Sequence, residues 1–152
     1  FDHHAVVYEY KNGVRLYSFC RQLAGGYCDV TDTLCGSKGR AILPSKPRIE
    51  GQNPWQFKGA RTSMTDNEQK ALFDSLRAGK PINCGNYMFT STMLGILAQM
   101  VCYTGQQLTW DEAMKSQVRL APDRYAWDAE PPVKPTSDGQ YPCAMPGITK
   151  FA

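Results

Sequence analysis

The sequence predicts an α+β domain with an open-faced antiparallel or mixed β-sheet, two to three helices on one face of the sheet and an extended, proline-rich C-terminal tail. Three observations lead to this prediction. Strand-like segments come first, segments with helical periodicity follow from about residue 65, and six of the ten prolines fall after residue 118. Strands and helices in separate blocks, without β-α-β alternation, are typical of the α+β class.

A β-hairpin is expected at the start of the chain. His3 to Tyr10 and Val14 to Arg21 are rich in β-branched and aromatic residues, and Asn12-Gly13 between them is a strong hairpin-turn signal. A two-residue turn at Asn12-Gly13 would pair each residue before it with one residue after it. One face would then carry the cross-strand pairs Tyr10/Arg15, Tyr8/Tyr17, Val6/Phe19 and His4/Arg21.

Further strands are expected before residue 60. Residues 27–34 form a third candidate strand, the turn Gly36-Ser37-Lys38-Gly39 follows, and residues 40–43 form a short fourth strand that stops at Pro44. After the proline-bounded stretch 47–54, residues 56–58 can add an edge strand.

Three helices are expected next. Thr65-x-x-Glu68 has the pattern of a capping box and opens a helix over about 66–78, which Gly79 closes. Asn86 can cap a second, largely apolar helix that ends at Gly105. Thr109-x-x-Glu112 is another capping box and predicts a short third helix. The sheet and helices form the expected core, 1–117, and the tail, 118–152, is expected to lie on the same domain or on a neighbouring subunit.

Composition excludes several classes of function. Seventeen basic and fourteen acidic residues leave a net charge of +3, and the basic residues are scattered, so a nucleic-acid partner is not expected. The longest apolar stretch, 93–101, is far shorter than the ~20 residues of a membrane span. The six cysteines contain no C-x-x-C pair, so we expect reduced, mostly buried thiols rather than a metal site.

Motifs for complete enzymes are missing from the sequence. There is no G-x-G-x-x-G, G-x-S-x-G, H-E-x-x-H or P-loop. His3 and His4 are successive residues of a strand, so their imidazoles should diverge rather than share a metal. We expect no catalytic, cofactor-binding or metal-binding residue in this chain.

Several stretches, in order, resemble the C-terminal domain of the Gfo/Idh/MocA oxidoreductase family, in the branch common in planctomycetes and related bacteria. The residues that carry the resemblance lie at 1–4, 18–22, 36–40, 76–83, 103–106, 108–113 and 145–151. The resemblance implies a two-domain protein, with a Rossmann half that binds NAD or NADP and a sheet-bearing half that contacts a sugar or cyclitol and forms the oligomer interface. The family's Glu-Lys-Pro motif is missing here, since Gly79 precedes Lys80-Pro81.

On this interpretation the chain is a non-catalytic piece of an NAD(P)-dependent dehydrogenase, with its natural N-terminus missing, and binds no cofactor by itself. His4 and Arg21, at the open end of the hairpin, are the predicted substrate-binding residues, because imidazole and guanidinium groups suit hydroxyls. The alternative for Arg21 is a structural pairing with a carboxylate or an aromatic ring. The predicted oligomer interface is the aromatic face that carries Tyr8, Tyr10, Tyr17 and Phe19, which could instead be buried under helices.

Two other functions stay open on sequence grounds: a stand-alone ligand-binding α+β module, or a structural interaction protein that has lost its chemistry. The discriminating observation is whether coding sequence upstream of Phe1 contains a glycine-rich βα turn. The expected compartment is the cytoplasm, with export by a twin-arginine signal as the alternative.

Overall fold

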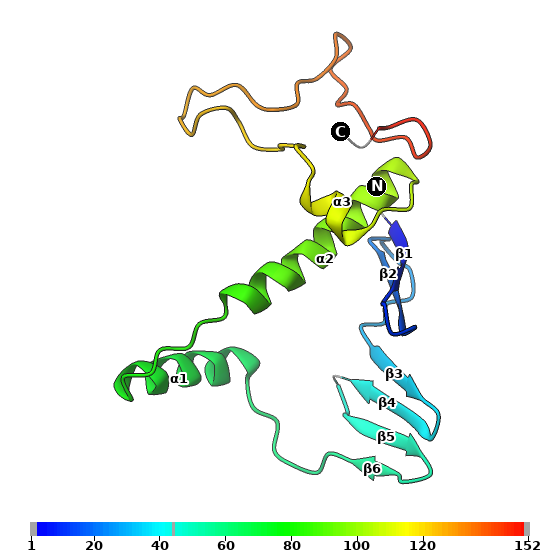
Figure 1. The fold of residues 1–152 in the computed structure, drawn as a ribbon, viewed down its shortest axis with the longest axis vertical. Coiled ribbons are helices and arrows are strands. Elements are labelled where there is room, and N and C mark those ends of the chain that lie inside the picture. The colour runs from blue at the N-terminus through cyan, green and yellow to red at the C-terminus, as the bar shows by residue number, and fades with distance from the viewer. Residues whose placement is uncertain (1–2, 44, 151–152) are drawn as a thin grey trace. The chain divides into compact units, whose positions relative to one another are not determined.

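The computed structural model describes residues 3–43 and 45–150, and it contains two open antiparallel sheets and three helices (Figure 1). The predicted α+β class with open sheets is therefore confirmed. The chain divides into two compact units: the chain up to Leu23 together with the chain from Cys84 onward, and the segment Ala24–Asn83 between them. The organisation into a core over 1–117 and a tail over 118–152 stays a prediction.

The first unit begins with the expected hairpin, β1 (His3–Glu9) and β2 (Arg15–Arg21). Its connection is a three-residue loop, not the predicted two-residue turn. The N–H of Tyr10 donates to the carbonyl of Val14 at 2.9 Å, and the N–H of Gly13 donates to the carbonyl of Tyr10 at 2.9 Å. Only Gly13 has a positive φ in this turn, at 83°, whereas a type I′ turn would require a positive φ at Asn12 as well.

The predicted strand register is therefore wrong by one residue. His4 lies opposite Cys20, Tyr8 lies opposite Leu16, and Arg21 lies opposite His3. Because side chains alternate between the two faces of a sheet, a one-residue slip moves the side chains of one whole strand to the other face. The aromatic face expected to combine Tyr8 with Tyr17 and Phe19 does not form.

The long helix α2 (Gly85–Thr104) packs against β1, and the short helix α3 (Trp110–Met114) packs against α2. Met93, Leu97 and Ala113 form a small buried cluster at these contacts. Helix α2 ends as predicted at Gly105, whose φ of 67° is left-handed, but it begins after Cys84 rather than Asn86. The capping box of α3, formed by Thr109 and Glu112, is confirmed.

The described part of the tail, up to residue 150, contains no helix or strand, as its prolines predict (Figure 1, orange to red). It returns to the end of α2, where the N–H of Gly147 donates to the carbonyl of Thr104 at 2.7 Å. Phe1, Asp2, Pro44 and Phe151, which entered the sequence predictions, lie outside the described residues.

The second unit carries four antiparallel strands in sequential order (Figure 1). These are β3 (Asp32–Gly36), β4 (Gly39–Leu43), β5 (Arg48–Gly51) and β6 (Trp55–Gln56). The third strand was predicted too early, at 27–34, since pairing with β4 begins only at Asp32. Strand β5 was not predicted, because Ile49 is its only large apolar residue and the period of two is hidden by its flanking prolines.

Glu50 of β5 is paired with one arginine on β4, Arg40, and with one on its own strand, Arg48. Glu50 accepts hydrogen bonds from Nε of Arg40 at 2.8 Å and from Nε of Arg48 at 2.7 Å. The hydrogen bonds from these two guanidinium groups lower the pKa of Glu50 from its usual value, and the bond from Arg48 has the larger effect. Gly39 and Gly51 lie opposite each other. A Cβ on Gly39 would come within 2.5 Å of the carbonyl oxygen of Glu50 on β5, and a Cβ on Gly51 would come equally close to the carbonyl oxygen of Lys38, in the turn before β4.

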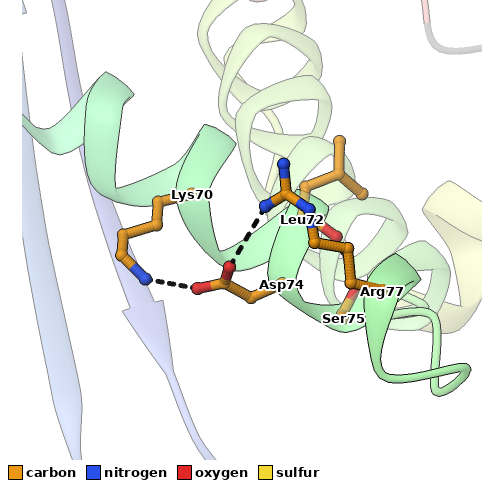
Figure 2. A network of polar contacts seen from close by, with 5 residues as sticks. All are labelled: Lys70, Leu72, Asp74, Ser75 and Arg77. Atoms are coloured by element: carbon orange, nitrogen blue, oxygen red, sulfur yellow. Dashed lines mark hydrogen bonds and ion pairs between the residues drawn. The ribbon is translucent and has the colours of Figure 1, made fainter.

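Helix α1 (Met64–Arg77) also belongs to the second unit. Its N-cap is Ser63, whose hydroxyl accepts from the N–H of Asp66, so the predicted capping box at Thr65 and Glu68 is wrong. On its surface Asp74 bridges Lys70 and Arg77, one turn away on either side (Figure 2). The predicted stop at Gly79 is confirmed by its φ of 66°.

Candidate functional site

The inward face of the hairpin carries the even-numbered residues of both strands. Its cross-strand pairs are His4 with Cys20, Val6 with Ser18, and Tyr8 with Leu16. Val6 is buried where β1 meets α2. The three-residue loop thus places an imidazole, a thiol and a hydroxyl on the same side of the sheet as the helix.

Tyr8 fixes the hairpin to α2. Its hydroxyl donates to the carbonyl oxygen of Leu94 at 2.7 Å, between residues 86 positions apart in the sequence. Burial, with smaller contributions from Tyr10 and Cys102, raises the pKa of Tyr8, so the phenol stays a neutral donor. Tyr8 was predicted to lie at an oligomer interface, whereas the structure shows it packed against the buried cluster within its own chain.

A groove of about 600 Å³ lies between the inward face of the hairpin and α2. Its hairpin side is formed by the three cross-strand pairs named above. Its helix side is formed by one stripe of α2, from Thr92 through Gly95 and Ile96 to Gln99, together with the neighbouring Leu94 and Ala98. Gly95 leaves the middle of this stripe open, because a Cβ placed there would have no neighbour within 4 Å.

The groove has an apolar floor and a few polar groups. Val6, Ile96 and Leu16 supply apolar surface, while Ser18, Thr92, Gln99 and His4 supply hydrogen-bonding groups. Among the described residues that line it there is no carboxylate, lysine or arginine. Such a groove suits an uncharged ligand that has both hydroxyl and C–H surfaces.

His4 lies at the open end of the hairpin and faces the helix. Its Nδ1 is 3.8 Å from Sγ of Cys20, within hydrogen-bonding range for sulfur. Its ring also lies against Tyr103 of α2, with ring centroids 6.1 Å apart and planes tilted by 54°. The imidazole is thereby placed between β2 and the helix.

Arg21, the other predicted substrate-binding residue, is not beside His4. It lies opposite His3, on the outward face of the hairpin, and is not found among the described residues that line the groove. The predicted His4/Arg21 pair is therefore wrong, because it depended on the two-residue turn. A role for Arg21 in substrate binding by a larger protein stays a prediction.

The outward face of the hairpin is apolar in its middle. Phe19 and Tyr17 are exposed to 73% and 56%, beside Val7 at 51%. Tyr10, near the tip of the hairpin, is also exposed. Of the four predicted interface residues, Tyr17 and Phe19 thus share one exposed face, which Tyr8 does not join.

Sequence reasoning missed most of the groove. Thr92, Gly95, Ile96 and Gln99 recur at helical spacing, which was a usable signal for one face of α2. Cys20 and Ser18 could be placed on the groove side only with the correct register. Which strand the helix would cover was not encoded in any local pattern.

Over 3–43 and 45–150 no three His, Cys, Asp or Glu side chains gather where they could hold a metal ion. None of the helices described there is both long enough and apolar enough to span a membrane.

No protein-family model, curated protein sequence or solved structure matches this chain.

Proposed function

We propose that this chain is the substrate-side and assembly domain of an NAD(P)-dependent oxidoreductase that acts on a sugar or cyclitol. The observation that carries the proposal is the groove between β1–β2 and α2. Its volume of about 600 Å³ lies within the range of roughly 300–1,000 Å³ of small-molecule sites. The ordered resemblance to the Gfo/Idh/MocA C-terminal domain supports the same assignment.

The groove chemistry supports a polyol as the ligand. Hydroxyl groups of a sugar ring need donors and acceptors, which Ser18 supplies from β2 and which Thr92 and Gln99 supply from α2. The C–H faces of the ring can lie on Val6 and Ile96. The absence of charged side chains among the described lining residues argues for a neutral sugar or cyclitol rather than a sugar phosphate or acid.

The nucleotide would be held outside this chain. The sequence has no dinucleotide fingerprint, and the Gly36–Gly39 turn joins two antiparallel strands. Because this turn does not lead into a helix, it offers no helix N-terminus to a pyrophosphate. The described lining of the groove offers no cationic side chain to a phosphate. On this proposal the cofactor is held by the Rossmann half that the resemblance implies.

The assembly role rests on the outward face of the hairpin. Burying an aromatic side chain such as Phe19 contributes roughly 1.5–3 kcal/mol on area grounds. A second copy of the same face would cover Tyr17 and Phe19 symmetrically, as closed dimers require. Homo-oligomer formation through this face is part of the proposal.

Titration of ¹⁵N-labelled protein with aldoses and cyclitols tests the substrate assignment. We expect the amides of Ser18, Thr92 and Gln99 to shift on addition of at least one of these compounds, and not on addition of NADH. Thr92→Val should weaken the binding, since it removes a hydroxyl with little change in shape. Thr90→Val is the matched control, because its hydroxyl bonds the carbonyl of Asn86 within α2.

The outcomes separate the candidate functions. Groove shifts with polyols but not NADH support a substrate-side domain. NADH binding at micromolar affinity would contradict the proposal that the nucleotide site lies outside this chain. The absence of a response to any polyol would contradict the substrate assignment. In a full-length enzyme, His4→Ala should lower kcat/KM, whereas Arg21→Ala with unchanged kcat/KM and unchanged Tm would remove Arg21 from the site.

A further inference from the structure

His4 and Cys20 form a thiol–imidazole pair at one end of the groove. They lie directly opposite each other on β1 and β2, and Sγ of Cys20 is 3.8 Å from Nδ1 of His4. Opposed residues of an antiparallel pair have Cβ atoms about 4.5–5.5 Å apart, so the backbone register itself holds the two groups together. Tyr103 packs against the imidazole from α2 and restricts its orientation.

The cysteines of this chain differ in what surrounds them. All six are free, and five of them are exposed, so the expectation of mostly buried thiols is wrong. Cys20 is exposed, lines the groove and has an imidazole within reach. Cys28 is equally a free, exposed thiol, but it lies in the second unit, outside any strand or helix. The two thiols therefore form a natural comparison within one molecule.

The chemical consequence follows from thiol reactivity. The thiolate, not the thiol, is the nucleophile, and a neighbouring imidazole that accepts the thiol proton increases its population. Tyr103 packs against the imidazole from α2, Tyr8 lies farther along β1 on the same face as His4, and Gln99 lines the α2 side of the groove. The described lining contains no carboxylate that would oppose the thiolate. The groove gives a small molecule access to Sγ.

We propose that Cys20 is a reactive thiol, activated by His4, and that it undergoes exchange with small disulfides that enter the groove. Nδ1 of His4 takes the proton of the Cys20 thiol. The thiolate sulfur then attacks one sulfur of the disulfide, a new S–S bond forms to Cys20, and the original S–S bond breaks. The leaving thiolate takes the proton from His4 and departs as a free thiol, so the incoming disulfide is the oxidant and no other reagent is needed.

The adduct has a defined location. Cys20 shares the inward face with Ser18 and Leu16, so a substituent on its sulfur extends along the groove. A molecule joined to Cys20 and a ligand bound at Ser18 would compete for the same space. This site is independent of the proposed function, because its chemistry needs neither a sugar nor NAD(P).

Reaction with oxidised glutathione, followed peptide by peptide with mass spectrometry, tests the proposal. We expect Cys20 to form the mixed disulfide about tenfold faster than Cys28 in the folded protein at neutral pH. His4→Ala should bring the rate at Cys20 to within about twofold of the rate at Cys28. His3→Ala is the matched control and should leave the ratio unchanged, since His3 lies on the other face of the same strand.

A second measurement needs no variant and so does not depend on the folding of His4→Ala. In concentrated urea the register that opposes His4 to Cys20 is lost, and the ratio of the two rates should fall to about one. Equal rates at Cys20 and Cys28 in the folded protein would overturn the proposal. So would a high ratio that persists in urea, or one that survives in a folded His4→Ala protein.

Discussion

The hydroxyl of Tyr8 on β1 donates a 2.7 Å hydrogen bond to the carbonyl oxygen of Leu94 on α2. This contact joins the start of the chain to a helix 86 residues later. Tyr8 packs against the buried cluster that contains Met93 and Leu97, and Tyr8 and Leu94 both line the groove.

Tyr8→Phe should lower the free energy of unfolding by about 1 kcal/mol, the net contribution of one such hydrogen bond. Urea denaturation followed by circular dichroism measures the change. Tyr17→Phe is the control, since Tyr17 lies on the outward face, and it should change stability by less than about 0.5 kcal/mol. Equal effects of the two substitutions would contradict the assigned role of Tyr8.

The raised pKa of Tyr8 adds a pH dependence. Because the folded pKa lies above the unfolded value, the neutral Tyr8 phenol contributes its full stabilisation below the unfolded pKa of about 10. This contribution is lost as the pH rises through the folded pKa. The stability of the wild-type protein should therefore decline more steeply above about pH 10 than that of Tyr8→Phe. Parallel pH profiles for the two proteins would show that the phenol does not titrate differently on folding.

Gly39→Ala should destabilise the four-stranded sheet strongly. Gly39 has a φ of 153°, and a Cβ there would lie 2.2 Å from the carbonyl oxygen of Glu50. Strand β5 must move to relieve this contact, at a cost of about 1–3 kcal/mol. Hydrogen exchange of the amides of β4 and β5 measures the effect locally.

Gly36→Ala is the matched control for that substitution. Gly36 is at the other end of the same turn, and its nearest neighbour to a new Cβ would be the carbonyl oxygen of Gly39 at an ordinary 3.7 Å. Gly36→Ala should change the free energy of unfolding by less than about 0.5 kcal/mol. Comparable losses of exchange protection in both variants would mean that the close approach of β4 to β5 is not the cause.

Glu50 should titrate at a lower pH than an unpaired glutamate, because Arg48 and Arg40 both donate to it. Because the pKa of Glu50 is lower in the folded protein, the ionised carboxylate stabilises the fold above the unfolded pKa. This contribution to the free energy of unfolding is lost as the pH falls through the folded pKa. An NMR titration of the Glu50 carboxyl carbon should give a midpoint that rises in Arg48→Gln and, less strongly, in Arg40→Gln. An unchanged midpoint in both variants would remove the ion pairs as its cause.

Tyr17→Glu should weaken self-association through the outward face of the hairpin. A carboxylate at the centre of an apolar interface would be buried without a partner, which costs several kcal/mol. Light scattering over a range of protein concentrations measures the change in mass. Lys11→Glu is the control, because it introduces a glutamate at a solvated position of the hairpin tip, and it should leave the association intact. A monomeric mass for the unmodified chain at every concentration would contradict the interface.

The hairpin shows how far the sequence predicts this fold. Asn12-Gly13 located both strands to within about one residue, because a glycine with positive φ is needed in either type of turn. The same pair did not distinguish a two-residue turn from a three-residue loop that includes Lys11. The difference decided whether His4 meets Arg21 or Cys20, so the strands were predicted correctly and their facing side chains were not.

The helices show a similar division. Their ends at Gly79 and Gly105 were predicted because left-handed glycine stops are local signals. The start of α1 was misplaced, since Ser63-x-x-Asp66 and Thr65-x-x-Glu68 are competing capping patterns within one turn. The groove was beyond sequence reasoning, because it depends on which face of α2 meets which face of β1, and that is a tertiary choice.

The hydrogen bond between Gly147 and Thr104 turns the proline-rich tail into a closed loop. Closing a long, flexible loop has an entropic cost that grows with the logarithm of its length. Six prolines lie inside this loop, and each restricts φ before folding begins. Pro146 is next to the closing contact, and the other five are Pro122, Pro131, Pro132, Pro135 and Pro142. The prolines therefore lower the entropy lost on closure, and replacing several of the five prolines that precede Pro146 by alanine would weaken the attachment of the tail at Thr104 without removing any contact there.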